Sequence, residues 1–336
     1  MEDVAHLSHS TAKAYNEIIR KVDAAFLATS PVSEILQNIS RFRNNISFII
    51  TSVKHYVHFN TSQSDFSEQN TDSYERAITG SWVGFFQSTK ADDIIDKLCD
   101  MMPIGVQFIL GKPNIASTDL LQLPEYEAAV ELGFAGAYLD VIPCGDGTLG
   151  LYVGSGCGQG GLSRRFRDYL CDSKIGLSNS HRELLERPFA TMNLKPVAFL
   201  HPDNLSPSWC ILAESVLMVY LGTIRPVDAD DYSELPQTSS RKRFCTPEMW
   251  NLVCQAKPPD VDLAIGKGNR TWSLLQNHNR RYSKEPCVAC GITVGELRAN
   301  NRHWALVDPK NPAGGVMCCF PCTLLPVCIE FTLQPF

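Results

Sequence analysis

The chain has 336 residues, of which 44% are hydrophobic and 20% are charged, so it can bury a substantial core and is not intrinsically disordered. Its formal net charge of −6 at pH 7 argues against a surface that binds nucleic acid or anionic membrane over its whole extent, and any basic site must be local. The longest apolar stretch, near residues 209–222, is too short to span a bilayer and contains Glu214, so we expect no contact with a membrane interior.

The amino-terminal 20 residues carry charged side chains at Glu2, Asp3, Glu17 and Arg20 and no apolar core, so we expect no secretory signal. The chain has 13 cysteines, an odd number. Without export these thiols should stay reduced in the cytoplasm or nucleus, where clustered cysteines hold metal more often than they form disulfides.

Apolar side chains recur at helical intervals over residues 1–60, which predicts amphipathic helices with a break near Pro31. Residues 61–130 contain four lysines and arginines against eleven acidic residues, so this segment should not face a phosphate backbone. We therefore predict a helical amino-terminal region over residues 1–128 that packs inside the protein or binds a protein partner.

After residue 130 the pattern changes to short apolar runs separated by glycine. Residues 136–142 and 150–154 are strand-like, and Cys144-Gly-Asp-Gly147 between them is typical of a hairpin turn. A glycine-rich loop then leads into a basic helix that starts near Leu162, and residues 195–200 and 208–221 predict a further strand and helix. The fold class is therefore α/β (α+β), with a small antiparallel sheet flanked by helices over residues 129–256. The loop spacing does not match the dinucleotide-binding pattern G-x-G-x-x-G.

Four segments in this region resemble the GIY-YIG nuclease domain. They are Gly136-Ala-Tyr138, Tyr152-Val-Gly154, the helix run Arg164-Arg-Phe-Arg-Asp-Tyr169 and Glu214 on an apolar helix. The resemblance implies that Tyr138 and Tyr152 are the paired tyrosines, Gly154 closes the second strand, Arg165 is the helix arginine and Glu214 is the metal ligand.

Two features depart from the family pattern. The loop before the arginine is longer, so Arg164 remains an alternative to Arg165, which is favoured because it stands four residues before Tyr169. The family asparagine is missing between residues 224 and 240, and Asn251 is the nearest later candidate.

Phosphodiester hydrolysis gives these residues consistent roles. A Mg²⁺ or Mn²⁺ ion held by Glu214 and waters would stabilise the leaving oxygen, and Arg165 would bind the scissile phosphate through two hydrogen bonds. One tyrosine would orient or deprotonate the attacking water. Tyrosines on strands and arginines on helices are usually structural, but a glutamate among the apolar residues 211–218 needs a partner or a function.

The carboxy-terminal segment carries two C-x₂-C knuckles. Cys287, Cys290, Cys319 and Cys322 can form a tetrahedral Zn²⁺ site, and the residues between them resemble a GATA-type zinc finger. The doublet Cys318-Cys319 leaves the third ligand ambiguous, His303 is an alternative ligand, and a set of buried free cysteines is the alternative to a metal site. We predict a basic, zinc-binding module over residues 257–336.

Basic residues concentrate near this module, with nine lysines and arginines against four acidic residues over residues 240–286. Such a segment can bind phosphates of DNA. The sequence therefore predicts a nuclear or cytoplasmic, metal-dependent endonuclease that cleaves DNA. The alternative is a catalytically inactive scaffold or regulatory protein that contains zinc and binds DNA or protein.

Overall fold

The computed structural model describes residues 2–63, 78, 80–157, 160–171, 179–201, 208–225, 247–269, 272–274, 305–308 and 311–317. The chain divides into two compact units, of which the first contains residues 1–50, 95–226 and 256–270 and the second contains residues 51–94, 227–255 and 271–336. The expected domain boundary after residue 128 falls inside the first unit. The first helix of the chain and the central sheet therefore belong to one compact body.

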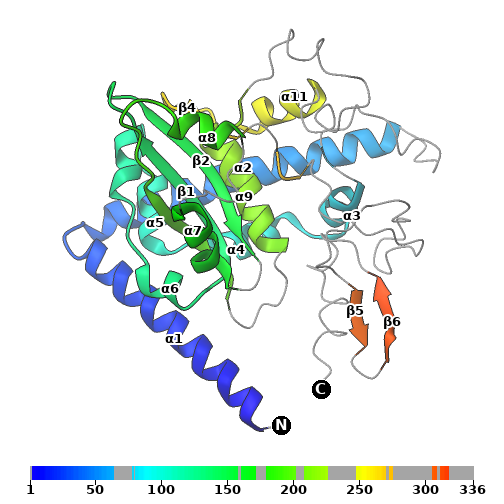
Figure 1. Cartoon of the computed structure of the whole chain (residues 1–336). Helices are drawn as coiled ribbons and strands as arrows, with labels where there is room; N and C mark the ends of the chain where they lie inside the picture. The colour runs from blue at the N-terminus through cyan, green and yellow to red at the C-terminus, as the bar shows by residue number, and fades with distance from the viewer. Residues whose placement is uncertain are drawn as a thin grey trace. The chain divides into compact units, whose positions relative to one another are not determined.

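The elements of the first unit comprise helices on both sides of one sheet (Figure 1). In chain order they are α1 (Glu2–Leu27), the first part of α2 (Val32–Gln63), the last part of α4 (Ala91–Met101), α5 (Ile104–Leu110), η2 (Ser117–Gln122), α6 (Glu127–Glu131), β1 (Gly136–Pro143), β2 (Leu149–Gly156), α7 (Gly161–Leu170), α8 (Asn179–Leu185), β3 (Leu194–Phe199), α9 (Ser208–Tyr220) and β4 (Gly266–Lys267).

The sheet has the strand order β3-β1-β2-β4. β1 is antiparallel to both β2 and β3, which agrees with the expected antiparallel sheet, but the short β4 runs parallel to β2 beside Gly150 and Leu151 and makes the sheet mixed. Helices α7 and α9 both pack on β1 and β2. Because helices cover β1 from both sides, all of its residues before Pro143 are buried.

The turn between β1 and β2 forms for local reasons. Gly147 adopts a φ of +79°, a conformation that costs glycine little, and its N–H donates to the carbonyl of Cys144 over 3.0 Å. The carboxylate of Asp146 accepts a hydrogen bond of 2.9 Å from the Thr148 N–H. These contacts set the register that aligns Tyr138 with Gly154 and Asp140 with Tyr152.

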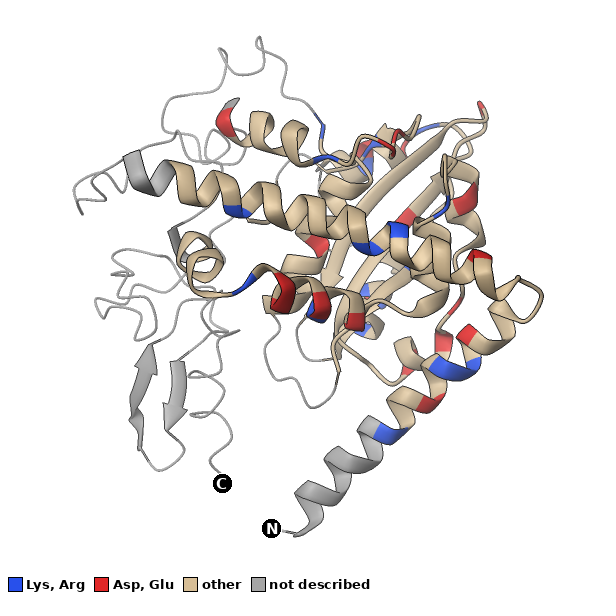
Figure 2. Cartoon of the chain, turned by 180° about the vertical axis from the view of Figure 1, so that it is seen from behind, with Lys and Arg blue, Asp and Glu red and all other residues tan. Residues whose placement is uncertain are grey.

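Helix α1 is attached to the rest of the first unit through a buried carboxylate. Asp23 accepts hydrogen bonds from the N–H groups of Ile104 and Gly105, at 3.0 and 2.9 Å, and from the Tyr126 hydroxyl at 2.7 Å. Tyr15 of the same helix packs edge-on against aromatic rings near the sheet. The outer side of α1 carries charges of both signs, including the pair Glu17 and Lys21 (Figure 2).

The second unit contains the remainder of α2 and α4, together with α3 (Gly80–Ser88), α11 (Pro247–Ala256), β5 (Ala305–Asp308) and β6 (Asn311–Met317). The Tyr56 hydroxyl donates to Glu248 at 2.6 Å and so joins α2 to α11. Strands β5 and β6 form an antiparallel pair. In the part of the chain that the structure describes, no helix combines the length and apolar character needed to cross a bilayer.

Candidate functional site

The two predicted tyrosines lie on neighbouring strands and on the same face of the sheet. Tyr138 on β1 is 0% exposed and Tyr152 on β2 is 8% exposed, and their ring centres are 6.3 Å apart. This proximity follows from the hairpin register, because Tyr138 stands opposite Gly154 and Tyr152 therefore lies diagonally across the strand pair.

Gly154 makes room for the Tyr138 ring. A Cβ atom placed on Gly154 would lie 2.3 Å from the Tyr138 hydroxyl oxygen and 2.5 Å from Cζ, far inside van der Waals contact. The resemblance to the family predicted Gly154 as the residue that closes the second strand. In the structure, the absence of a side chain at Gly154 leaves space for the Tyr138 ring to lie over β2.

Helix α7 adds an arginine and a third tyrosine to this pair. The Tyr138 hydroxyl donates to the Tyr169 hydroxyl over 2.6 Å, and the guanidinium carbon of Arg165 lies 4.7 Å from the centre of the Tyr169 ring. Arg164 instead faces Asp168 at 3.9 Å. Of the two arginines that the sequence left open, the structure places Arg165 beside the tyrosines.

Burial controls the protonation of these groups. Burial is the main reason that the pKa values of Tyr138 and Tyr152 lie well above the usual range for tyrosine. Burial also raises the pKa of Tyr169, although Arg165 opposes the shift. Burial opposes the charge of Arg165, but the tyrosine oxygens around it raise its pKa above the usual range. At neutral pH the site therefore contains neutral phenols beside a guanidinium cation.

Glu214 approaches the same site from α9. It is partly exposed on a helix that is otherwise buried, and its Oε2 accepts a hydrogen bond of 2.5 Å from the Ser155 hydroxyl. The negative charge of Glu214 is close enough to raise the pKa values of Tyr152 and Tyr169. The structure thus brings together Glu214 and the residues predicted on β1, β2 and α7.

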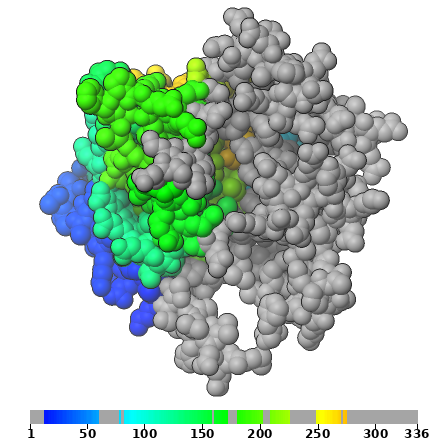
Figure 3. Space-filling model, viewed as in Figure 1, coloured from blue at the N-terminus to red at the C-terminus, as the bar shows by residue number. Residues whose placement is uncertain are grey.

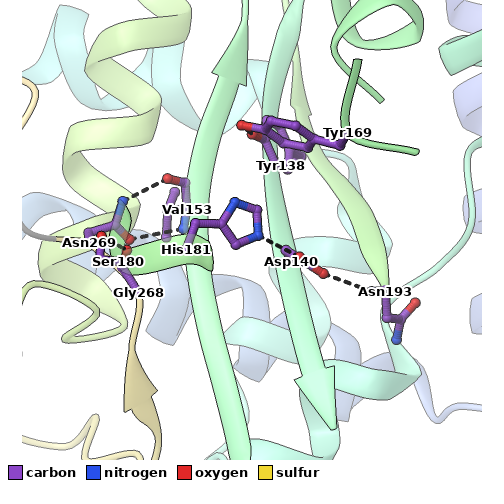
Figure 4. A network of polar contacts seen from close by, with 9 residues as sticks. All are labelled: Tyr138, Asp140, Val153, Tyr169, Ser180, His181, Asn193, Gly268 and Asn269. Atoms are coloured by element: carbon purple, nitrogen blue, oxygen red, sulfur yellow. Dashed lines mark hydrogen bonds and ion pairs between the residues drawn. The ribbon is translucent and has the colours of Figure 1, made fainter. Parts of the chain in front are cut away.

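Asn269, which the sequence did not single out, is hydrogen-bonded to the edge of β2. The side chain of Asn269 accepts a hydrogen bond of 3.0 Å from the Val153 N–H and donates one of 2.8 Å to the Val153 carbonyl (Figure 4). It therefore replaces a neighbouring strand at this position, because β4 pairs only with Gly150 and Leu151. Asn251, the candidate named from sequence, is exposed on α11 of the second unit.

A buried acid and histidine lie next to the tyrosines and were also missed. Asp140 on β1 and His181 on α8 are both 0% exposed, and the carboxylate Oδ2 is 2.7 Å from the imidazole Nε2 (Figure 4). Asp140 Oδ1 accepts a hydrogen bond of 2.7 Å from the Asn193 N–H. The available signal was an aspartate within the apolar strand 136–142, which needs a partner when it is buried.

Within the described ranges, no group of three or more histidine, cysteine, aspartate or glutamate side chains could hold a metal ion. Glu214, as a single carboxylate, fits a hard divalent cation that keeps most of its water ligands. The predicted zinc ligands Cys287, Cys290, Cys319 and Cys322, and the alternatives Cys318 and His303, lie outside the residues that the structure describes.

Comparison of the chain with models of protein families, with curated proteins and with solved structures finds no match.

Proposed function

We propose that the chain is a metal-dependent endonuclease that hydrolyses phosphodiester bonds of DNA. The observation that carries the proposal is the convergence of Tyr138, Tyr152, Arg165 and Glu214 from two strands and two helices. A cation, a carboxylate and phenols with perturbed pKa values gather at functional sites more often than in a core that serves stability alone. In the space-filling view, the segment that contains these strands and α7 reaches the surface of the first unit (Figure 3).

Arg165 supplies the strongest argument for a phosphate. Among the described residues no carboxylate lies within ion-pair distance of its guanidinium, and its buried Nε atom has no hydrogen-bond acceptor. Arg165 is partly buried, and a cation that loses hydration without gaining an anionic partner is destabilised. A phosphate oxygen would satisfy this donor and the charge together, and the planar guanidinium matches a phosphate through paired hydrogen bonds.

The tyrosines would act chiefly through hydrogen bonds. Because burial raises the pKa values of Tyr138 and Tyr152, neither is a phenolate base at neutral pH in the state described. A neutral phenol can accept a hydrogen bond from the attacking water and donate one to a phosphate oxygen. Orientation of water therefore suits these residues better than its deprotonation.

Glu214 would hold the divalent cation. Mg²⁺ or Mn²⁺ would supply charge stabilisation for the leaving oxygen. The Ser155 hydroxyl orients the Glu214 carboxylate by donating to Oε2, and such a carboxylate would bind the cation directly or through one of its waters. The basic segment at residues 240–286 would add contacts to the DNA backbone.

The proposal is tested by nicking of supercoiled plasmid and cleavage of branched and single-stranded DNA with Mg²⁺ or Mn²⁺. Glu214→Gln keeps the side-chain shape and removes the charge, so cleavage should fall by at least about a hundredfold, while the folded state persists. Glu131→Gln, at an exposed position on α6, is the matched control and should cleave normally. Equal turnover in Glu214→Gln and wild type would refute the assignment.

A second function is favoured by the complete burial of the Tyr138 side chain. In that alternative the first unit has lost nuclease activity, and the chain is a zinc-containing scaffold that binds DNA or protein. DNA binding that is unaffected by Glu214→Gln, together with no cleavage of any substrate by the wild type, would support it.

A further inference from the structure

The buried pair Asp140 and His181 packs against the tyrosines of the site. The imidazole ring of His181 stacks on Tyr152, with ring centres 4.1 Å apart and an interplanar angle of 4°. The Tyr169 ring meets the same imidazole edge-on at 5.3 Å and 81°. His181 is therefore in ring contact with two of the three tyrosines.

The contacts of this pair also fix the imidazole in space. The Asp140 carboxylate bonds His181 through one oxygen and the Asn193 N–H through the other, each at 2.7 Å. The preceding residue, Ser180, donates to the Gly268 carbonyl at 2.7 Å and attaches α8 to the end of β4 (Figure 4). The ring that supports Tyr152 is thus held from β1, α8 and the segment after β4.

Stability alone does not explain the pair. Replacing both partners of a buried hydrogen bond by apolar side chains of the same shape can be nearly neutral or stabilising. On the same sheet face, the Tyr138 ring packs against Phe166 at 5.3 Å and its hydroxyl bonds Tyr169. The imidazole of the pair touches the rings of Tyr152 and Tyr169, which points to an effect on these aromatic side chains.

We infer that Asp140 and His181 form a positioning pair that sets the orientation and the electronic environment of Tyr152 in the phosphodiester site. The Asp140 carboxylate requires a proton on His181 Nε2, so it fixes both the tautomer and the rotation of the ring. The stacked imidazole then holds the Tyr152 ring parallel to itself, and the Tyr152 hydroxyl points consistently at substrate. The pair acts through Tyr152 and touches no substrate.

Asp140→Asn tests the inference because it keeps the shape and can reverse the hydrogen bond. The asparagine carbonyl still accepts from the Asn193 N–H, whereas its NH₂ group donates to His181 Nε2 and moves the imidazole proton to Nδ1. The turnover number for duplex cleavage should fall by roughly tenfold or more, the range found for partners of functional side chains. KM for DNA should stay within about twofold, because the pair makes no contact with DNA. The control is Asp262→Asn, at a side chain that is 93% exposed.

The rate measurement rests on the proposed nuclease function, so a spectroscopic measurement accompanies it. Tyrosine labelled with ¹³C at Cζ reports the environment of each phenol, and Tyr152→Phe assigns the Tyr152 signal. In Asp140→Asn this signal should shift, while the Tyr126 signal should not, because that hydroxyl bonds Asp23 elsewhere in the unit.

The outcomes separate the two proposals. If wild type cleaves no DNA but the Tyr152 signal shifts, the nuclease function fails and the positioning pair stands. If the signal and the turnover number both match wild type, the pair is structural and the inference is overturned. Should Asp140→Asn fail to fold, the double variant Asp140→Asn/His181→Phe removes the charge and keeps an aromatic ring under Tyr152. A normal turnover number and an unshifted Tyr152 signal in that variant would also overturn it.

Discussion

Replacement of Gly154 by alanine should disrupt the site through one added carbon. The new Cβ would lie 2.3 Å from the Tyr138 hydroxyl oxygen and 2.9 Å from Cε1, whereas ordinary contacts begin at 3.4 Å. The Tyr138 hydroxyl must therefore move by about 1 Å, or β2 must retreat from β1. Tyr138 is fully buried against Phe166 and Tyr169, so neither movement is free.

The expected magnitudes follow from this displacement. Overpacking of a core typically costs about 1–3 kcal/mol, and each kcal/mol lowers the melting temperature of a unit of this size by roughly 2–4 °C. A shift of about 1 Å would also stretch the 2.6 Å hydrogen bond between Tyr138 and Tyr169 beyond bonding distance. Misplacement on this scale costs up to about a hundredfold in turnover. Gly154→Ala should therefore lose far more activity than stability.

Scanning calorimetry and plasmid nicking measure the two effects. Gly150→Ala on the same strand is the matched control, since its Cβ would lie 3.2 Å from the two Leu184 methyl carbons and 3.5 Å from Ile142 Cβ, a much smaller overlap. Adding Tyr138→Phe to Gly154→Ala removes the closest clashing atom and should recover part of the stability without recovering cleavage. A Gly154→Ala protein that melts and cleaves like wild type would show that Tyr138 does not lie across this strand as described.

Three further predictions concern the arginine, the asparagine and the zinc. Arg165→Lys should slow cleavage more than Arg164→Lys, because a lysine cannot reproduce a paired contact to phosphate, and the opposite order in single-turnover rates would assign the role to Arg164. Asn269→Asp removes the donor to the Val153 carbonyl and should lower stability by about 1–3 kcal/mol in urea unfolding, and an unchanged midpoint would contradict this. The purified chain should contain about one Zn²⁺, lost in Cys319→Ser but kept in Cys318→Ser, as elemental analysis would show.

Much of the first unit could be predicted from local sequence. Strands β1 and β2, their turn and the start of α7 follow from alternating apolar residues, glycine punctuation and a change to helical spacing. The break at Pro31 is confirmed by the end of α1 at Leu27 and the start of α2 at Val32. Strands, turns and helix ends depend on residues within a few positions of one another in the sequence, so the local sequence pattern predicts them.

Site residues that depend on distant partners were harder to recognise. His181 lies in the polar run Ser180-His-Arg182, which suggests a solvated helix, and only its contact with Asp140 reveals burial. Asp140 itself interrupts an apolar strand, just as Glu214 interrupts an apolar helix. Asp140 therefore meets the same criterion as Glu214. An aspartate within an apolar strand predicts a buried partner, but the sequence does not identify that partner as His181.

Asn269 could not be recognised from its spacing along the chain, whereas the unpaired peptide groups of Val153 explain its position. Loop-closure entropy grows slowly with length, so a long segment can separate Asn269 from Val153 at little thermodynamic cost. The Val153 N–H and carbonyl, however, are buried beyond the end of β4 and must be satisfied wherever the chain runs. The side-chain amides of asparagine and glutamine present a donor and an acceptor side by side, as a peptide group does. The unpaired peptide groups of β2 therefore determine where an amide side chain must lie. The residue that supplies this amide can be far away in the sequence.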